Sequence, residues 1–389
     1  MGYILKQPLW GILAHGLRRY GLMRLSLVIY SMHGGGAERV MKLLCDAWAG
    51  QGHELTLITL AEVASDFFQV DPRVRRVGLG LLADSPGLCP ALANNAARLR
   101  GLRRALKASR PQAIISFGDA TNVLTILAAL GLKPPVVVCE HTDPHHHQVG
   151  RLWSALRRLT YPLADAVVGV SPAAEEYVKR FVRRRPVLTI PNPIQPPRPD
   201  AGPPRRPWPL GPTVMGMGRL HPSKGFDLLL RAFAACQEAG PSWRLVILGE
   251  GPERPRLEAL ALELGIAQRV HLPGQVAEPA PLLRQAEFFV MSSRYEGFPM
   301  ALTEAMSCGL AVVASDCSAG VRQIVRPGLD GLLVPPGEPE ALAQAMLWLM
   351  QNPQGRASLA AKAPEVVERF GLRRVLEQWD SLFRQLGVG

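Results

Sequence analysis

The fold is decided first by the stretch Arg24-Leu-Ser-Leu-Val-Ile-Tyr-Ser-Met-His-Gly-Gly-Gly-Ala-Glu-Arg-Val40. A nearly continuous apolar run is followed by three glycines and then by helix-forming residues. Strands that are buried on both faces have this pattern, so it predicts a parallel strand, a tight turn and a helix. The glycines let the backbone approach a ligand, and the helix start offers N–H groups to an anion. A simple strand-to-helix turn explains the pattern equally well, because it matches neither the dinucleotide fingerprint nor the P-loop.

Short apolar runs alternate with helical stretches through the rest of the chain, which indicates parallel sheets flanked by helices. In the first half the expected strands span residues 25–30, 54–59, 113–117, 136–139, 166–170 and 187–190. In the second half they span residues 213–216, 244–248, 270–272, 288–291, 311–314 and 331–334, and the chain is then helical to its end, with breaks near Pro353, Pro364 and Gly371.

The best domain boundary is residues 196–212, where 8 of the 17 residues are proline. Such a segment suits neither a helix nor a central strand and reads as a stiff connector. The sequence therefore predicts an α/β protein with two doubly wound Rossmann-like domains that face a cleft. We expect an extension at residues 1–22, a first domain at 23–195, a second domain at 213–370 and a C-terminal helix at 371–389.

Residues 1–22 have two interpretations. One is an interfacial amphipathic segment, since the stretch is mildly apolar and carries Lys6, Arg18 and Arg19. The other is an upstream start codon with Met23 as the working start. The second is favoured because the first strand begins at Arg24. A signal peptide fits poorly, because the arginine pair follows the apolar part.

Charge is unevenly distributed over the 389 residues, whose formal net charge is +12. Residues 1–200 hold 25 Lys and Arg against 14 Asp and Glu, whereas the remainder holds 19 against 18. This asymmetry indicates an anionic partner for the first half, either a membrane surface, a phosphorylated substrate or nucleic acid. The six cysteines form no C-x-x-C pair, which fits a reducing compartment. No apolar run reaches the about 18–20 residues of a membrane span.

The second half carries the most specific motifs. A glycine-rich loop holds Arg219 and Lys224, which at a strand end would be able to clamp a diphosphate; two solvated loop charges are the alternative. Downstream, Glu296 lies just before an expected helix start and Glu304 lies within that helix. The helix start offers the N–H groups of Met300 and Ala301 to a phosphate oxygen, and the two carboxylates accept hydrogen bonds from sugar hydroxyls.

The pattern Glu296-x7-Glu304 resembles the family 4 (group 1) retaining glycosyltransferases of the GT-B fold. The resemblance also includes Gly218-Arg219…Lys224-Gly225, Leu248-Gly-Glu-Gly-Pro-Glu253, Leu272-Pro-Gly-Gln275, Pro191-Asn-Pro193 and Gly331-Leu-Leu-Val-Pro-Pro-Gly337. In the first half, Gly34-Gly-Gly-Ala-Glu-Arg39, Ile115-Ser-Phe-Gly-Asp119 and Glu140-His141 resemble a narrower group, the N-acetylgalactosamine-type transferases that extend undecaprenyl diphosphate oligosaccharides.

The resemblance implies a hexosyltransferase that uses a nucleotide-sugar, chiefly a UDP-sugar, in polysaccharide or lipopolysaccharide biosynthesis. Arg219 and Lys224 would hold the diphosphate, Glu296 the donor sugar and Glu304 the ribose. Further residues are expected to bind substrate or to act at the acceptor side, namely Gly35, Gly36, Gly297, Phe298, Met300, Ala301 and His141. The resemblance implies no cofactor and no metal, and the chain has no D-x-D pair, so His145-His-His147 reads as a polar loop.

Two alternatives remain at this point. A basic nucleic-acid-binding protein would fit the charge, although aromatic residues are only 6% and no recognised nucleic-acid module is present. A nucleotide-sugar epimerase or a phosphorylase on a similar fold would fit the domain pattern, although a phosphorylase needs a pyridoxal lysine that no motif provides.

A basic helix is expected at residues 96–109. Arg100, Arg103, Arg104 and Lys107 follow helical spacing, so they are predicted to share one face. Further cations gather at Arg151, Arg157 and Arg158 and at residues 179–185. We expect this surface to meet anionic lipid headgroups and a polyprenyl diphosphate acceptor, as a peripheral protein on the cytoplasmic face of the inner membrane. Solvated surface is the alternative.

Overall fold

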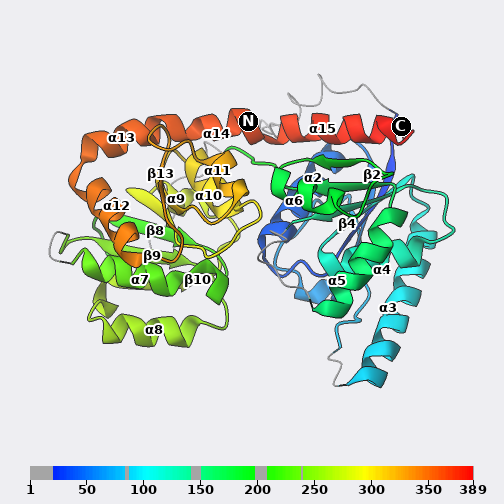
Figure 1. Cartoon of the computed structure of the whole chain (residues 1–389), viewed down its shortest axis with the longest axis horizontal. Helices are drawn as coiled ribbons and strands as arrows, with labels where there is room; N and C mark the ends of the chain where they lie inside the picture. The colour runs from blue at the N-terminus through cyan, green and yellow to red at the C-terminus, as the bar shows by residue number, and fades with distance from the viewer. Residues whose placement is uncertain (1–20, 84–86, 142–149, 198–207, 238–239, 389) are drawn as a thin grey trace, which may run out of the picture.

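The computed structural model describes residues 21–83, 87–141, 150–197, 208–237 and 240–388. Two α/β domains lie side by side, one built on a seven-stranded sheet and the other on a six-stranded sheet (Figure 1). Every strand pair that the register describes is parallel. Most of the extension at 1–22, most of the proline-rich connector and the histidine triplet lie outside the described residues.

The first domain has the strand order β3-β2-β1-β4-β5-β6-β7. Its strands are β1 (Arg24–Ile29), β2 (Glu54–Thr59), β3 (Arg75–Gly78), β4 (Ala113–Phe117), β5 (Val136–Glu140), β6 (Ala166–Gly169) and β7 (Val187–Thr189). Its helices are α2 (Gly36–Gly50), α3 (Leu88–Ser109), α4 (Asp119–Ala129), α5 (Arg151–Thr160) and α6 (Pro172–Lys179), with short 3-10 turns at Val63–Ser65 and Tyr161–Leu163.

The second domain has the strand order β10-β9-β8-β11-β12-β13. Its strands are β8 (Thr213–Met217), β9 (Arg244–Leu248), β10 (Val270–Gly274), β11 (Phe288–Met291), β12 (Ala311–Ser315) and β13 (Leu332–Val334). Its helices are α7 (Phe226–Ala235), α8 (Arg254–Glu263), α9 (Ala280–Leu283), α10 (Met300–Ser307), α11 (Ala319–Ile324), α12 (Pro339–Gln351), α13 (Pro353–Lys362) and α14 (Val366–Phe370), followed by α15 (Leu372–Gln385); 3-10 turns lie at Pro222–Lys224, Ala267–Arg269 and Ala363–Glu365.

Each expected strand is present, with ends that differ from the prediction by at most two residues. The predicted helix at 96–109 is the second part of α3. Strand β3 was not predicted. It pairs only with β2, at the edge of the sheet, and two of its four residues are arginine, so it lacks the apolar run of a central strand.

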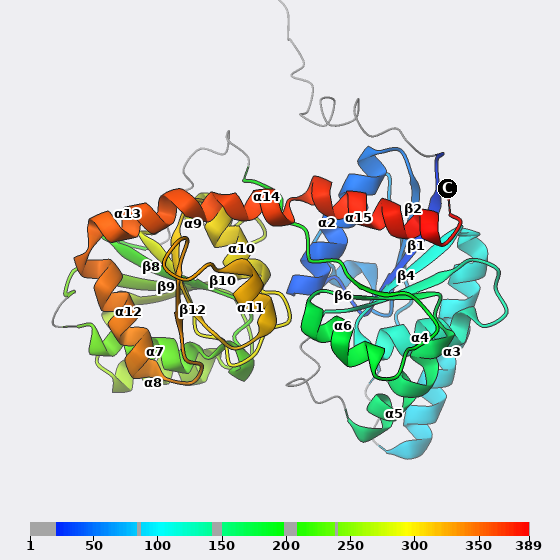
Figure 2. The same ribbon diagram turned by 45° about the horizontal axis from the view of Figure 1, so that its top comes forward.

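The last helix returns to the first domain. Figures 1 and 2 show α13, α14 and α15 crossing over both domains. Trp379 on α15 packs edge-on against Trp48 of α2, with 5.7 Å between the ring centroids. The chain crosses between the domains next to Ile194 and Gly371, where the Ile194 N–H donates to the Phe370 carbonyl and the Leu372 N–H donates to the Ile194 carbonyl, each at 2.9 Å. These two hydrogen bonds therefore join the two segments that cross between the domains.

Among the described residues, no helix is both long enough and apolar enough to cross a bilayer.

Trp379→Ala is expected to lower the free energy of unfolding of the first domain by about 3–5 kcal/mol, because it leaves a large cavity between α15 and α2. Denaturant unfolding followed by circular dichroism measures the loss. The exposed Glu377 on the same helix provides the control, since Glu377→Ala should change stability by less than about 0.5 kcal/mol. Equal stability of the two variants would show that α15 does not belong to the first domain's core.

Candidate active site

The two sheets present their carboxyl ends to each other. The order of each sheet reverses beside its first strand, between β1 and β4 and between β8 and β11, which is where ligands bind in doubly wound folds. The glycine loop after β1 reaches the start of α10, because a Cβ added at Gly36 would lie 3.7 Å from Met300 Cγ. The Asn192 side chain donates to the Phe298 carbonyl at 3.3 Å. The glycine loop of the first domain and the start of α10 in the second domain therefore lie against each other.

Lys224 is fixed by its loop. Gly225, which follows it, has φ +61°, and a Cβ there would lie 2.1 Å from the Ser292 carbonyl oxygen, so only glycine lets this loop approach the end of β11. The Ser292 hydroxyl donates to the Lys224 carbonyl at 3.0 Å. Lys224 Nζ then lies 2.6 Å from Glu296 Oε1. The exposed Arg219 has no hydrogen-bond or ion-pair partner among the described residues and is free to meet a ligand.

Glu296 is held from two sides. In addition to Lys224, the Ser293 hydroxyl donates to Glu296 Oε1 at 2.7 Å. Its side chain is only 11% exposed. The carboxylate thus keeps its second oxygen for a hydroxyl group of a ligand.

Helix α11 and the Phe370 ring pack against the start of α10 and the loop before it. A Cβ added at Gly320 of α11 would lie 1.9 Å from the Gly297 carbonyl oxygen, so α11 lies directly on this loop. The Phe298 ring is buried against Phe370, with 5.2 Å between centroids. Phe298 therefore anchors the loop with its side chain, while the first N–H groups of the helix, at Met300 and Ala301, have no side-chain cap from Pro299.

Glu304 meets a partner that the sequence analysis missed. Arg39 of α2 reaches across the cleft and forms an ion pair with Glu304. Burial raises the pKa of Glu304, and the charge of Arg39 opposes this shift. The signal in the sequence was the position of Arg39, one helical turn after Gly35 at the start of α2. At Gly35, the absence of a side chain leaves room for the Glu38 carboxylate, which caps the helix start.

His141 directly follows β5, and its ring packs in a tilted arrangement against Phe117 with 4.1 Å between ring centroids. Burial lowers the pKa of His141 to about 4, and Asp119 and Asn192 only partly oppose this effect. The ring is therefore neutral at neutral pH. Both ring nitrogens are buried, and neither has a well-formed hydrogen bond among the described residues.

A buried charge cluster supports His141. The neighbouring Glu140 accepts a hydrogen bond from Tyr161, and Arg157 lies 3.6 Å from Glu140 and 3.7 Å from Asp119. Burial raises the pKa of Glu140, with Asp119 adding to the shift and Arg157 opposing it. Arg157 was expected in a surface cluster, but it is 2% exposed, because it neutralises these two carboxyl groups.

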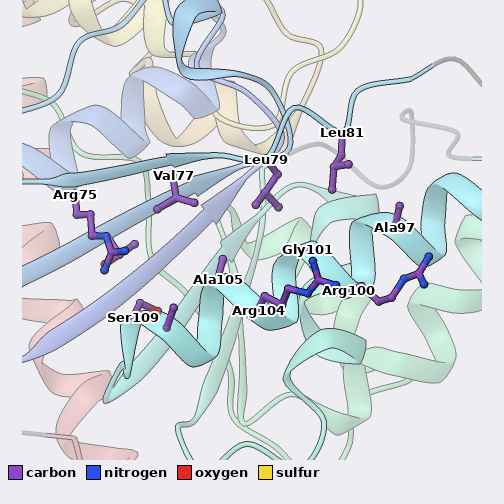
Figure 3. A pocket seen from close by; sticks show the side chains of 12 residues that line it. Arg75, Val77, Leu79, Leu81, Ala97, Arg100, Gly101, Arg104, Ala105 and Ser109 are labelled. Carbon is purple, nitrogen blue, oxygen red and sulfur yellow. The ribbon is translucent and has the colours of Figure 1, made fainter.

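A separate cavity of about 590 Å³ lies between strand β3 and helix α3 (Figure 3). Val77, Leu79 and Gly101 line its apolar part, and Arg75, Arg100 and Arg104 add three cations. A Cβ at Gly101 would lie 2.9 Å from the end of the Leu81 side chain, so a larger residue there would require that side chain to shift. This cavity belongs to the outer edge of the first domain and not to the cleft.

Arg103 differs from its neighbours on α3. Its guanidinium donates to the carbonyls of Ala128 and Leu130, at 2.8 and 2.7 Å, and so holds the end of α4. The predicted basic face is therefore divided, and its solvent-facing part consists of Arg100, Arg104 and Lys107. No group of three or more potential metal ligands occurs in the described part of the chain.

Two family models match the chain. The glycosyl transferase 4-like domain matches residues 35–193, and glycosyl transferases group 1 matches residues 210–366. A Campylobacter jejuni relative, GalNAc-alpha-(1->4)-GalNAc-alpha-(1->3)-diNAcBac-PP-undecaprenol alpha-1,4-N-acetyl-D-galactosaminyltransferase, is 27% identical over 94% of this chain and 99% of its own. The Salmonella typhimurium lipopolysaccharide 1,6-galactosyltransferase is 32% identical over 46% of this chain and 50% of its own.

Solved structures have the same fold. Sucrose-phosphate synthase from Thermosynechococcus elongatus superposes with a TM-score of 0.79 at 24% identity, covering 93% of this chain and 99% of its own. Anabaena Alr3699/HepE in complex with UDP-glucose superposes with a TM-score of 0.75 at 20% identity, covering 93% and 100%. The two-domain arrangement is thus the GT-B fold. The matches favour a transferase over a nucleic-acid-binding protein, an epimerase or a phosphorylase. The chain belongs to the group 1 glycosyltransferases, with a glycosyl transferase 4-like first domain.

Proposed function

We propose that this enzyme moves a sugar from a UDP-sugar to a glycan on a polyprenyl diphosphate, with retention of the anomeric configuration. The observation that carries the proposal is the cluster of Lys224, Glu296 and the uncapped start of α10 at the carboxyl edge of the second sheet. Cations and free N–H groups there suit a diphosphate, and a half-buried carboxylate beside them suits sugar hydroxyls. The UDP-glucose complex of Anabaena HepE, which has the same fold, supports the choice of donor.

The chemistry follows from the charges that develop. Breaking the bond between the anomeric carbon and the phosphate oxygen leaves negative charge on the nucleoside diphosphate and positive charge on the sugar ring. Lys224, Arg219 and the start of α10 stabilise the first charge. The acceptor oxygen attacks on the face from which the diphosphate departs, and the departing phosphate oxygen takes the acceptor's proton. The neutral ring of His141 offers a hydrogen bond to the sugar from the acceptor side, and Gly35 and Gly36 let the first domain close on it.

The acceptor is proposed from two observations. The Campylobacter jejuni relative, by its name, acts on an undecaprenol-linked glycan. In addition, helices α3 and α5, which both pack on α4, contain no acidic residue. Arg100, Arg104 and Lys107 on α3 are exposed beside the β3–α3 cavity. This surface suits anionic headgroups and a lipid diphosphate on the cytoplasmic face of the inner membrane.

Exposed leucines extend that surface. Leu152 and Leu159 on α5 and Leu163 after it are 68%, 72% and 52% exposed, and Arg151 and Arg158 flank them. Leucines beside arginines are typical of a segment that rests in the headgroup region of a bilayer. Figures 1 and 2 show α3, α4 and α5 gathered in the lower part of the first domain.

Lys224→Ala and Arg219→Ala are each expected to lower kcat/KM by about 10²–10³, the scale of losing one preorganised contact to a developing anion. Steady-state assays that follow UDP release measure this effect. Asp227→Asn provides a control for the loop, because Asp227 pairs with Arg294 and not with Lys224 or Glu296. Turnover near that of the wild type in both Lys224→Ala and Arg219→Ala would show that this loop does not bind the diphosphate.

Activity is expected to survive EDTA unchanged, because Arg219, Lys224 and the helix start supply the positive charge that a metal would otherwise provide. The assay compares initial rates before and after dialysis against chelator. Loss of activity that Mn²⁺ or Mg²⁺ restores would contradict this mechanism.

Changing Arg100, Arg104 and Lys107 together to Gln is expected to abolish salt-sensitive co-sedimentation with phosphatidylglycerol vesicles, since each basic residue contributes about 1 kcal/mol near an anionic surface. The matched control changes three exposed arginines elsewhere, Arg231, Arg256 and Arg373, and should keep the binding. Equal sedimentation of the two variants would exclude α3 as the membrane contact.

A further inference from the structure

Arg39 belongs to the first domain, but its side chain makes its polar contacts with the second. Its Nε forms the ion pair with Glu304 Oε1, and its Nη1 donates to the Ala277 carbonyl at 2.9 Å. Phe68 of the first domain supports the guanidinium from its own side, at 5.9 Å from the ring centroid. The side chain is 21% exposed, so its contacts are made in a partly dehydrated position.

We propose that Arg39 is a positioning residue for the donor nucleotide: it holds the Glu304 carboxylate in place across the cleft and leaves its second oxygen for the ribose hydroxyls. The inference rests on the proposed role of Glu304 as the ribose-binding residue. Glu304 Oε2 has no hydrogen-bond or ion-pair partner in the described part of the chain, whereas Oε1 is occupied by Arg39. The carboxylate therefore has one oxygen fixed and one free.

The local electrostatics explain why a cation is needed. Glu304 is buried on α10, and Glu278 from the loop before α9 adds a like charge that disfavours its ionised form. Cys308 on α10 is a neighbouring titratable group, and Arg284 at the end of α9 faces that thiol. Arg39 is thus the cation that opposes the raised pKa of Glu304. An ionised carboxylate accepts hydrogen bonds at both oxygens, whereas a protonated one turns one oxygen into a donor.

The guanidinium suits this task better than an ammonium group would. Its planar fork donates in two directions at once, here to a carboxylate on α10 and to a backbone carbonyl after β10. Gln275 adds a second link at the same place, because its side-chain nitrogen donates to the Gly34 carbonyl at 3.2 Å. The nucleotide end of the cleft is therefore closed by the first domain, and nucleotide affinity depends on that domain.

The test measures the dissociation constant of UDP by calorimetry at about pH 6 and about pH 8.5, on either side of neutrality. Arg39→Met should weaken UDP binding about tenfold at the higher pH, which is the scale of one charge-assisted contact. Without its partner, Glu304 has a still higher pKa and takes up a proton as the pH falls. The ratio of variant to wild-type dissociation constant should therefore grow severalfold at the lower pH. The terminal phosphate of UDP, with a pKa of about 6, titrates in the measurements on wild type and variant alike, so its effect cancels in this ratio.

Two variants serve as references. Arg39→Lys keeps the charge but loses the second hydrogen bond. Its ratio of UDP dissociation constants to wild type should therefore be smaller than that of Arg39→Met and should not grow at low pH. Lys42→Met removes a cation from the same helix and should bind UDP as the wild type does, because Lys42 contacts Asp46 and the Gln69 carbonyl within the first domain.

Glu304→Gln separates this inference from the proposed function. If Glu304→Gln weakens UDP binding but Arg39→Met does not, the ribose role stands and the positioning role of Arg39 is overturned. The positioning role of Arg39 is also overturned if the ratio of the UDP dissociation constants of Arg39→Met and wild type is the same at both pH values. A merely structural contact has no reason to depend on proton uptake by Glu304. If Glu304→Gln binds UDP as the wild type does, the ribose role itself fails. The supporting result is a ratio that grows at low pH in Arg39→Met and is constant when Glu304→Gln is added.

Discussion

The direction of the strands is the constraint on which the rest of the molecule depends. Because all strands within each sheet run parallel, every loop after a strand emerges at one edge, and both edges face the same cleft. The crossing segments at Ile194 and Gly371, bonded to each other, and the α15 helix packed on α2 keep the two edges opposed. Residues as distant in sequence as Gly36 and Met300 then come into contact.

Charges are paired both across and within the two domains. Each of the two carboxylates of the motif is met by a cation, Glu296 by Lys224 from its own domain and Glu304 by Arg39 from the other. The cluster of Glu140, Asp119 and Arg157 pairs buried charges within the first domain, at the end of β5 that His141 follows. Cations that look like surface charge in the sequence are thus divided between those that contact buried carboxylates or backbone carbonyls and those that stay exposed.

The sequence predicted those parts of the fold that local patterns determine. Buried strands such as residues 244–248 show continuous apolar runs, and the carboxylates at 296 and 304 flank a helix start that Pro299 marks. Strand β3 was not predicted, because an edge strand with two arginines lacks that pattern. The roles of Arg39, Arg103 and Arg157 could not be predicted, because their partners come from elements far away in the chain. The role of such a charged residue can be assigned only when the fold shows which group it contacts.

The central claim is that this cleft transfers a sugar with retention of configuration. The most direct measurement is the NMR coupling constant at the new anomeric centre, after incubation of the enzyme with a panel of UDP-sugars and a polyprenyl diphosphate-linked glycan. The account predicts transfer from at least one UDP-sugar, with the anomeric configuration of the product equal to that of the donor. A product of inverted configuration would contradict the front-face displacement, and transfer from a different nucleotide-sugar alone would contradict the proposed donor.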